Sequence, residues 1–259
     1  MFNTILLEKD NGIATITLNR PDFYNAFDNE MSFEFQDALK EVSKDREVRV
    51  LIITGAGKAF CSGQDLKDIS KEEKRNLGDS LHKRYNPVIR LICNMAKPVL
   101  CKLNGVAAGA GCSLALACDM IIASDNATLI EVFINVGLVL DSGSSYFLPR
   151  AVGTAKAFEM ATMGSKVKAE EAAQIGLINQ VVPAGELDKS VLEIAEYYAS
   201  APTKAIAIIK KMIRKSSTAT LEEMLQYEAY SQEIAGYSED YKEGIKAFIE
   251  KRKPNFKGE

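Results

Sequence analysis

The sequence lacks most of the patterns that identify a catalytic or metal-binding protein. Its single histidine, His82, lies in the polar stretch "GDSLHKRYNP" without a serine or cysteine motif, and a solvated side chain is the simplest interpretation. No GxSxG, P-loop or HExxH pattern occurs. The five cysteines are scattered singly without a CxxC, so we expect neither a disulfide framework nor a metal site, but reduced thiols in a cytoplasmic protein.

The sequence also lacks a strong charge of either sign and a long apolar run. The formal net charge of −3 argues against nucleic acid or an anionic membrane as the main partner. The beginning, "MFNTILLEKDNG", has no basic start followed by an apolar core, so no signal peptide is expected. The most apolar stretch, "VLCKLNGVAAGAGCSLALACDMIIA", is interrupted by Lys102, Asn104 and Asp119, which argues against a membrane span.

What is present predicts one α/β domain over residues 1–259. The strands "NTILLE" and "IATITLN" flank Asp10-Asn11-Gly12, a hairpin signal. Asp28 is a candidate cap for the amphipathic helix that follows it. The apolar strands "VRVLIITG", "PVLCKLNG" and "MIIA" alternate with helices, which indicates parallel pairing. From Ala155 onward we expect almost only helix, giving an α/β core over about 1–200 and a helical C-terminal region over about 201–259.

Two strand-to-helix turns are rich in glycine, "ITGAGKAFCSGQDL" and "LNGVAAGAGCSLALACD". Neither completes a dinucleotide fingerprint, because Phe60 and Leu114 stand where the third glycine belongs, and close backbone packing is an equally simple interpretation. The unpaired N–H groups at a helix start can also bind a developing negative charge. Two such groups from different loops would form an oxyanion hole for an enolate.

One acidic residue stands in apolar surroundings. Asp141 in "NVGLVLDSGSSYFLPR" is the only charged residue between Glu131 and Arg150. A carboxylate is costly to bury there without compensation. It could cap a helix that begins near Ser142–Ser145, or it could act as a base next to a carbonyl group. The residues alone leave both interpretations open.

The ordered motifs of the chain resemble the crotonase (enoyl-CoA hydratase/isomerase) superfamily. They are "LNRPDFYNAF", "LIITGAGKAFCSGQDL", "KPVLCKLNGVAAGAGCSLALACDMIIAS", "GLVLDSGSSYFLPRAVG", "AEEAAQIGLINQVVP" and "EGIKAFIEKRKPNF", and they cover nearly the whole sequence. The resemblance implies a spiral of ββα units with a helical trimerisation region. It also implies an acyl-CoA thioester as substrate, bound by a homotrimer or homohexamer, with coenzyme A as part of the substrate and no separate cofactor.

Site residues follow from the resemblance by position. The oxyanion N–H groups would belong to Gln64 and Ala110, and Asp141 would be the catalytic acid–base group. The last helix of a neighbouring subunit would bring Phe248 and Lys251 to the nucleotide, although a solvated helix end is an equal alternative for Lys251. The remaining residues expected to contact substrate, partly through backbone, are Ser62, Asp65, Leu66, Ser113, Phe133 and Tyr146.

The departures from the family pattern indicate the reaction. Ser113 and Phe133 stand where the resemblance places the two glutamates of hydratases, so hydration is not expected. Asp141 stands where dienoyl-CoA isomerases, 4-chlorobenzoyl-CoA dehalogenases and phenylacetate-pathway epoxide isomerases carry an aspartate, and the last group is the most similar. Leu140 replaces a proline and Ser144-Ser145 replaces a Gly-Gly pair, so the acyl group stays open.

We therefore expect an acyl-CoA isomerase that shifts a double bond or converts an epoxyphenylacetyl-CoA to its oxepin. Phe133, Tyr146 and Phe147 would form an apolar acyl pocket. Glu131 is the nearest spare acid: in the pocket it would make a two-acid isomerase, whereas in solvent it would leave Asp141 alone. The alternatives are a dehalogenase-like hydrolase, weakened because Asn86 occupies the histidine position of that group, a non-catalytic acyl-CoA-binding protein, and a nicotinamide oxidoreductase suggested only by the glycines.

Overall fold

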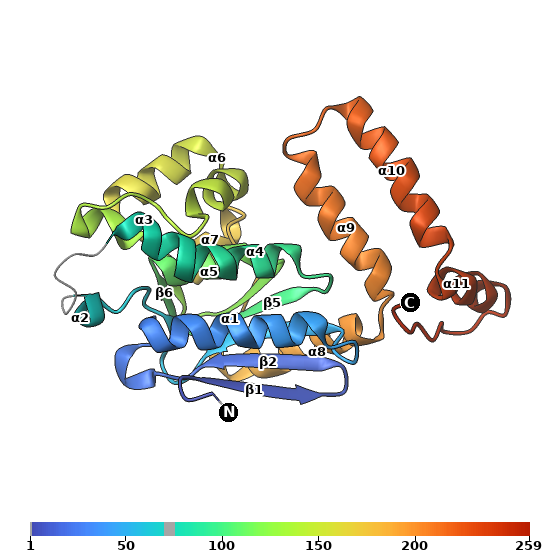
Figure 1. Cartoon of the computed structure of the whole chain (residues 1–259), viewed down its shortest axis with the longest axis horizontal. Helices are drawn as coiled ribbons and strands as arrows, with labels where there is room; N and C mark the ends of the chain where they lie inside the picture. Colours follow the sequence, from blue (N-terminus) through green and yellow to red (C-terminus); the bar gives the residue numbers. More distant parts are fainter. Residues whose placement is uncertain (1, 70–75) are drawn as a thin grey trace.

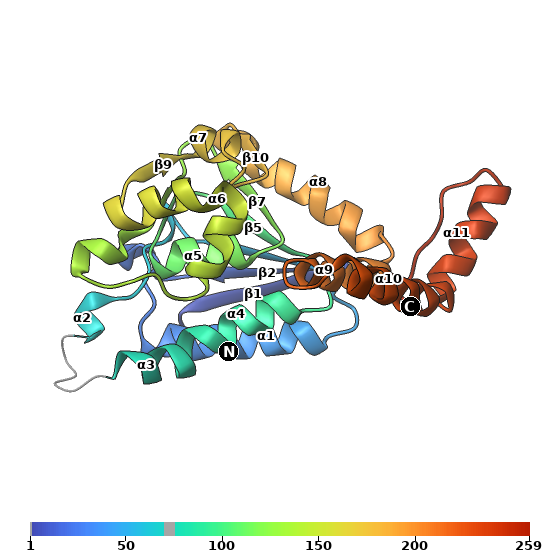
Figure 2. The ribbon, with the colours of Figure 1, turned by 90° about the horizontal axis from the view of Figure 1, so that it is seen from above.

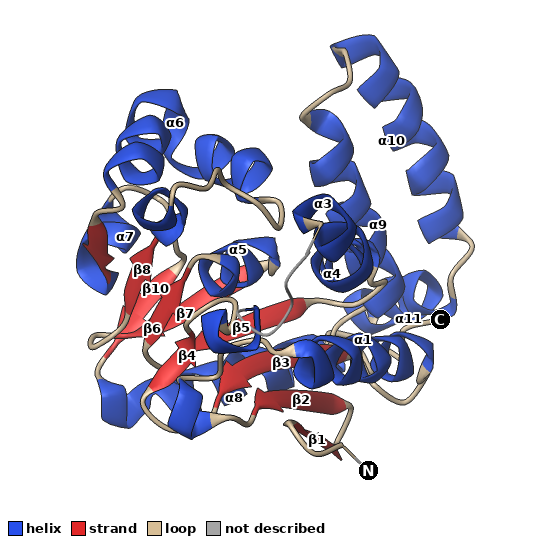
Figure 3. Cartoon of the chain, turned by 60° about the vertical axis from the view of Figure 1, so that its left-hand side comes forward, coloured by secondary structure: helices blue, strands red, loops and turns tan. Residues whose placement is uncertain are grey.

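The strands form two sheets in the computed structural model of the protein, which describes residues 2–69 and 76–259. A six-stranded sheet has the order β1-β2-β3-β5-β7-β10, and a four-stranded sheet has the order β4-β6-β8-β9 (Figure 3). The strands span β1 Ile5–Asp10, β2 Ile13–Leu18, β3 Val50–Gly55, β4 Ala59–Cys61, β5 Val99–Leu103, β6 Val106–Ala108, β7 Met120–Ser124, β8 Thr128–Ile130, β9 Lys166–Lys168 and β10 Gln180–Val182.

Pairing in the larger sheet follows the sequence pattern. Strands β1 and β2 form the predicted antiparallel hairpin, with Asp10 opposite Ile13 next to the turn. Strands β2, β3, β5, β7 and β10 then pair in parallel. All residues of β3 are buried, as its wholly apolar sequence predicts for a strand covered on both faces. The expected α/β architecture with parallel pairing is therefore confirmed.

The helices before the middle of the chain cover one side of this sheet. Helix α1 (Asn29–Lys44) begins as predicted, because the Asp28 carboxylate accepts a hydrogen bond of 2.8 Å from the Met31 N–H. It packs beside α4 (Asn86–Asn94), and both lie against the strands in Figure 1. Helix α4 continues two preceding helical segments without a gap: α3 (Leu77–Ser80) leads into a π-helical segment, η2 (Leu81–Tyr85), which leads into α4.

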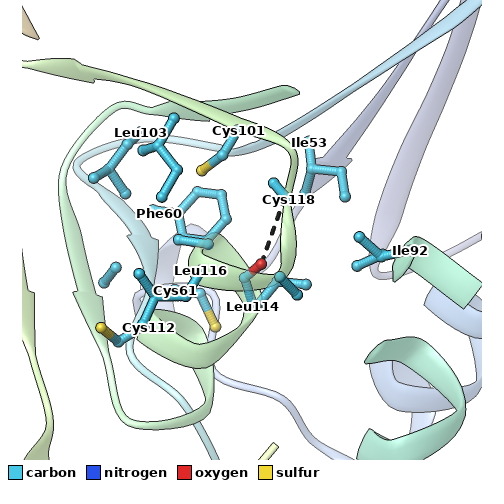
Figure 4. Close-up of a cluster of buried hydrophobic side chains, with 14 of the residues drawn as sticks. Ile53, Phe60, Cys61, Ile92, Cys101, Leu103, Cys112, Leu114, Leu116 and Cys118 are labelled. Carbon is cyan, nitrogen blue, oxygen red and sulfur yellow. Dashed lines mark hydrogen bonds between the residues drawn. The ribbon is translucent and has the colours of Figure 1, made fainter. Parts of the chain in front are cut away.

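Large apolar side chains and thiols fill the interior between α5 (Ala110–Ala117) and the strands. Figure 4 shows Phe60, Leu103 and Leu114 among four cysteines, of which Cys118 donates a weak hydrogen bond of 3.5 Å to the Leu114 carbonyl. All five cysteines are free thiols. Burial raises the pKa of Cys61 to about 12, so this thiol packs as an apolar group and does not act as a nucleophile.

The second half of the chain contains more strand than the sequence pattern predicts. Strand β9 pairs antiparallel with β8, and β10 pairs parallel with β7, so the expectation of almost only helix after Ala155 is wrong at these two places. Each strand has three residues between helices, which is too short to produce a recognisable alternation. The helices around them are α6 (Ser144–Met163), α7 (Ala169–Gln174) and α8 (Leu187–Ser200).

The last three helices leave the body of the molecule together. Helices α9 (Thr203–Ser216), α10 (Leu221–Gly236) and α11 (Glu239–Ile249) extend to one side of the sheets, as Figures 1 and 2 show. Their outward faces carry large apolar side chains that are exposed, Phe248 among them at 83%. None of the helices in the described part of the chain combines the length and apolar character that a membrane crossing requires.

Four short helices of the described part of the chain remain, of which α2 and η3 contribute residues to the pocket described next. They are η1 (Pro21–Phe23), α2 (Leu66–Ile69), η3 (Val132–Val136) and η4 (Ala184–Glu186). The η3 segment ends at Gly137, which adopts a left-handed φ of 72° and redirects the chain toward α6. The loop from Gly137 to Gly143 therefore carries Asp141 back over the start of α5.

Candidate active site

A pocket of about 280 Å³ lies where the loop after β4, the start of α5 and the loop before α6 meet. Its wall is mostly apolar or backbone, and Asp141 is the one acidic group among the described residues that line it. The residues that line it are Ser62, Gly63, Gln64, Leu66, Leu77, Tyr85, Gly109, Ala110, Val132, Phe133, Asn135, Val136, Leu138 and Asp141. Of the residues predicted for the site, it brings together Asp141, Gln64, Ala110, Ser62, Leu66 and Phe133.

Asp141 reaches this pocket through an unusual local backbone. The next two residues, Ser142 and Gly143, have left-handed φ values of 51° and 86°, and α6 begins immediately after them. A serine in this region is strained, so the turn is maintained by its surroundings. The side chain of Asp141 does not cap α6, because the N-cap position belongs to Gly143 and no side chain makes a capping bond there. The helix-cap interpretation of Asp141 is therefore wrong.

The carboxylate of Asp141 has little compensation. Among the described residues, one hydrogen bond reaches it, from the Ser142 hydroxyl to Oδ1 at 2.8 Å. Burial raises the pKa of Asp141 above its ordinary value of 3.8, and this hydrogen bond opposes the rise. A raised pKa brings the carboxyl group nearer to neutrality, where one group can accept a proton and return it.

The backbone of Asp141 is held more firmly than its side chain. Its carbonyl oxygen accepts a hydrogen bond of 3.0 Å from the Ser144 N–H and another of 3.1 Å from the Ser113 hydroxyl. Ser113 is completely buried in α5 and does not line the pocket. It therefore lies beneath the loop of Asp141, where the resemblance expected a residue in contact with substrate.

Two backbone segments approach each other opposite Asp141. Phe27 pairs with Gln64 as an isolated parallel bridge through the bonds Phe27 N–H to Gly63 O, 2.7 Å, and Asp65 N–H to Phe27 O, 2.9 Å. The backbone N–H of Gln64 consequently points away from Phe27, on the side of α5. Ala110 is the first residue of α5, so its N–H has no acceptor within the helix.

Glycine permits this close approach. A Cβ atom on Gly63 would lie 2.7 Å from the Ala108 carbonyl oxygen and 3.3 Å from the Ala110 nitrogen. A Cβ atom on Gly111 would lie 2.2 Å from the Cys61 carbonyl oxygen. The glycines of both sequence motifs thus serve close packing, and this packing brings Gln64 and Ala110 together in the lining of the pocket.

The other predicted site residues lie outside the pocket. Asp65 is buried in an ion pair with Arg20, 3.1 Å apart. Tyr146 and Phe147 line a second cavity on the other side of α6. Phe248 and Lys251 lie at the end of the helical arm, exposed. His82 is exposed, as expected.

Several residues of the pocket wall were not among the sequence predictions. Tyr85 enters from the π-helical segment η2, and Leu77 from α3. Val132, Val136 and Leu138 come from η3 and the turn after it. A π-helical turn gives no regular spacing of apolar residues in the sequence. Only the fold could therefore show that Tyr85 lines the pocket. Among the described residues, no cluster of histidine, cysteine or acidic side chains could hold a metal ion.

Comparison with known proteins agrees with this geometry. The sequence profile of the family described as Enoyl-CoA hydratase/isomerase matches residues 8–259. The chain therefore belongs to the enoyl-CoA hydratase/isomerase family and has its crotonase fold. The 1,2-epoxyphenylacetyl-CoA isomerase of Escherichia coli (strain K12) is 41% identical over 261 residues and covers 100% of both chains.

Other relatives carry a different activity in their names. A protein of Rhodobacter capsulatus named "Probable enoyl-CoA hydratase" is 41% identical over 257 residues, which are 99% of each chain. The crystal structure of enoyl-CoA hydratase from Bacillus anthracis superposes with a TM-score of 0.95 at 32% identity, covering 99% of this chain and 100% of that one. The family is thus shown, and the chain is an enzyme of the hydratase/isomerase type.

Proposed function

We propose that the protein is an acyl-CoA isomerase that uses Asp141 as its single acid–base group. The observation that carries this proposal is the pocket itself, whose mostly apolar lining combines one poorly compensated carboxylate with Gln64 and Ala110. A thioester carbonyl placed between the N–H groups of Gln64 and Ala110 would have its acyl chain beside Asp141. This arrangement suits proton abstraction next to a carbonyl.

The reaction then requires two proton transfers on one face of the acyl chain. Asp141 takes a proton from a carbon of the chain, and the electron pair moves onto the thioester oxygen as an enolate. The N–H groups of Gln64 and Ala110 stabilise that negative charge. Protonated Asp141 returns the proton at another carbon, so the bonds shift while the composition of the substrate is unchanged. The raised pKa of Asp141 favours this double role.

Hydration fits the site less well, although several relatives are named as hydratases. Adding water requires one group to activate it and a second to deliver a proton. Ser113 is buried and uses its hydroxyl to hold the backbone of Asp141, and Phe133 presents an apolar ring to the pocket. Asp141 remains as the only acidic group that the described part of the chain contributes to the wall.

The acyl group is best sought among small, apolar candidates. Phe133, Val132 and Val136 give the pocket an apolar side, and its volume of about 280 Å³ suits a compact group. A 3-enoyl chain, isomerised to the 2-enoyl form, is one candidate. The name of the Escherichia coli relative supplies the other, 1,2-epoxyphenylacetyl-CoA, whose ring would lie against Phe133 while Asp141 assists ring opening to the oxepin. Coenzyme A enters as part of the substrate, without a separate cofactor.

The alternative functions have weaker support. Aromatic dehalogenation would use Asp141 as a nucleophile, and Asn86, at the position of the expected histidine, is not part of the pocket wall. A nicotinamide oxidoreductase was suggested only by glycines, which here serve close packing. A non-catalytic acyl-CoA-binding protein has the same pocket and is separated from an isomerase only by activity.

We also propose a homotrimer or a hexamer of two trimers. Helices α9–α11 extend from the body and expose Ile213, Leu225, Ile245 and Phe248, which in isolation would leave a large apolar surface in water. Burial of these faces in a neighbouring subunit would also bring Phe248 and Lys251 to the nucleotide of its substrate. Light scattering should give a trimer or hexamer at micromolar concentration, and a stable monomer would contradict the assembly.

The activity is tested by Asp141→Asn, which keeps the shape of the side chain and removes the base. Wild-type protein is first screened with 3-enoyl-CoA and epoxyphenylacetyl-CoA substrates. On the substrate that turns over, Asp141→Asn should lower kcat by at least ~10²-fold, the usual scale for an acid–base group, while calorimetry shows acyl-CoA binding retained. His82→Ala, a change at an exposed residue, is the control and should leave kcat unchanged. Isomerisation at the wild-type rate by Asp141→Asn would refute the proposal.

A further inference from the structure

A second acid lies directly behind the pocket. Glu131, at the junction of β8 (Thr128–Ile130) and η3, has a relative exposure of 0%. It does not line the pocket, and it does not point to solvent, so neither placement expected from the sequence is correct. Its Oε1 accepts a hydrogen bond of 2.5 Å from the Ser144 hydroxyl. Within the described part of the chain, its Oε2 has no hydrogen bond of ordinary geometry, and the Cys112 thiol is its neighbour.

Ser144 connects this acid to Asp141. It is the first residue of α6 and is itself completely buried. Its hydroxyl reaches Glu131, while its backbone N–H donates the 3.0 Å hydrogen bond to the Asp141 carbonyl. Rotation or displacement of Ser144 would therefore move the turn that carries Asp141. The Ser113 hydroxyl holds the same carbonyl from the side of α5, 3.1 Å away.

We propose that Glu131 is a positioning residue for Asp141, acting through Ser144 as a neutral carboxylic acid. The proposal rests on the proposed function insofar as Asp141 is the group that must be positioned. Glu131 touches neither the pocket nor a bound acyl group, so it is not a second catalytic acid. In this proposal Glu131 fixes the position of the first residue of α6. The strained turn at Ser142 and Gly143 then directs the carboxylate of Asp141 toward the pocket.

The surroundings of Glu131 favour its neutral form. Burial raises its pKa above the ordinary value, and the negative charge of Asp141, in the loop before α6, raises it further. Hydrogen bonds from Ser144 of α6 and Cys112 of α5 act in the opposite direction. Burial also raises the pKa of Cys112 well above its ordinary value, so this thiol stays uncharged. No cation of the described residues forms an ion pair with Glu131, and burial without a counter-charge favours the protonated form of a carboxyl group.

The neutral state makes a specific prediction for paired substitutions. Glu131→Gln is uncharged and retains an oxygen that Ser144 can bond, so it should keep most of the wild-type kcat. Glu131→Ala and Ser144→Ala remove the bond and should lower kcat by about 10-fold at unchanged KM, since a small displacement of a catalytic group is sufficient for such a loss. Ser145→Ala is the matched control, because the neighbouring serine is exposed and its substitution should change nothing.

A measurement without substrate separates this proposal from the proposed function. Infrared difference spectra of the full chain at pH 7 should contain the carbonyl stretch of a protonated carboxyl group that persists in Asp141→Asn and disappears in Glu131→Gln. Amide hydrogen exchange at residues 141–144 should accelerate in Ser144→Ala and not in Ser145→Ala, at equal thermal stability. These results can hold even if no isomerase substrate is found.

Two outcomes would overturn the inference. If the infrared band of Glu131 is that of a carboxylate, or if Glu131→Gln moves the acid limb of the pH–rate profile to lower pH, then Glu131 is charged in the native protein. If Ser144→Ala behaves like Ser145→Ala in hydrogen exchange and in kcat, then Ser144 does not position Asp141. The comparison of Ser144→Ala with Ser145→Ala tests the proposal even if the Glu131 variants do not fold.

Discussion

Two cavities of the molecule each contain a partly buried acid, and the surroundings of the two acids differ. The larger, about 390 Å³, contains Asp119, whose Oδ2 lies 2.7 Å from the Lys210 ammonium and accepts a 2.8 Å hydrogen bond from the Val99 N–H. Arg214 lies 3.4 Å from its other oxygen. The smaller cavity contains Asp141, which has one serine hydroxyl. The two acids therefore differ in charge compensation: Asp119 has cationic partners, whereas Asp141 has a hydroxyl group among the described residues.

The difference has a physical basis. Burial lowers the pKa of Lys210, and the carboxylate of Asp119 opposes that shift, so each charge makes the other tolerable. Within residues 2–69 and 76–259, the acid in the smaller cavity has no cationic partner, and its pKa rises. Removing a paired acid leaves the charge of its partner buried and uncompensated. An unpaired acid costs stability and can exchange a proton, which is the property that catalysis requires.

The largest change in the free energy of unfolding should come from replacing Asp119, the paired acid. Asp119→Ala leaves the buried ammonium of Lys210 with only the carbonyls of Ile92 and Lys97 as acceptors. We expect the free energy of unfolding to fall by about 3 kcal/mol, the scale for breaking a buried ion pair. Urea denaturation measures it.

A surface ion pair gives the control for this change. Lys102 and Asp188 are 2.6 Å apart, but the Asp188 side chain is 87% exposed. Asp188→Ala should change stability by less than about 0.5 kcal/mol, since exposed pairs contribute little. If Asp119→Ala and Asp188→Ala lowered the free energy of unfolding equally, the buried ion pair of Asp119 would contribute no more than an exposed one. The contrast between Asp119 and Asp141 would then have no energetic basis.

Replacing Asp141, the unpaired acid, should change the free energy of unfolding in the opposite direction. Asp141→Asn keeps the side-chain volume and removes the charge, so the free energy of unfolding at pH 7 should rise by about 0.5–1 kcal/mol, as is common when a functional residue is replaced. Denaturation by urea again measures the change. A loss of more than about 1 kcal/mol would mean that Asp141 contributes to the stability of the fold.

The same acid gives the protein a specific dependence on pH. Because its folded pKa is raised, the folded state binds the proton more tightly than the unfolded state does. Stability from this group is present below the ordinary pKa of 3.8 and is lost as pH rises through the folded value. Asp141→Asn should lack this loss. Activity should follow the reverse course, with an acid limb of kcat/KM above the usual aspartate range.

The smallest effect should come from the one hydrogen bond that the unpaired acid receives. Ser142→Ala removes the hydroxyl that lowers the pKa of Asp141, so the acid limb should move to higher pH. We expect kcat at neutral pH to fall by about two- to three-fold, the value of a modest hydrogen bond. An acid limb that moves to lower pH, or not at all, would show that this hydroxyl does not tune Asp141.

A glycine at the same position separates tuning from backbone strain. Ser142 has a φ of 51°, which glycine adopts freely. Ser142→Gly should shift the acid limb as Ser142→Ala does and be more stable than it. Pairs of pH–rate profiles and melting curves measure both differences.

The sequence predicted the local elements well. Asp10-Asn11-Gly12 closes a hairpin, Asp28 caps α1, and the apolar runs form the parallel strands. Each of these depends on neighbours a few residues apart, so a short window of sequence contains the cause. The short strands β9 and β10 could not be predicted in this way, because three residues contain no period and their partners lie 36 to 58 positions earlier in the chain.

The residues of the candidate site also fall into two groups, those that the sequence predicted and those that it did not. The motifs around Gln64, Ala110 and Asp141 identified the pocket, since the glycines that let two backbones meet must be encoded locally. Tyr146 and Phe147 were expected in the same pocket, yet α6 turns them toward the larger cavity. The direction of a side chain at the start of a helix depends on how that helix docks, which the residues of the helix do not specify by themselves.

By itself, then, the sequence determined the hairpin, the alternation of strands and helices, the glycine turns, and the presence of one acid in an apolar loop, because all of these follow from short-range sterics and polarity. Only the tertiary structure decided that Asp119 is compensated and Asp141 is not, and that Glu131 is buried behind Ser144. Solvation and charge pairing depend on atoms brought together from distant parts of the chain. The groups that pack around a carboxyl group therefore decide whether it forms a stable ion pair or has a raised pKa.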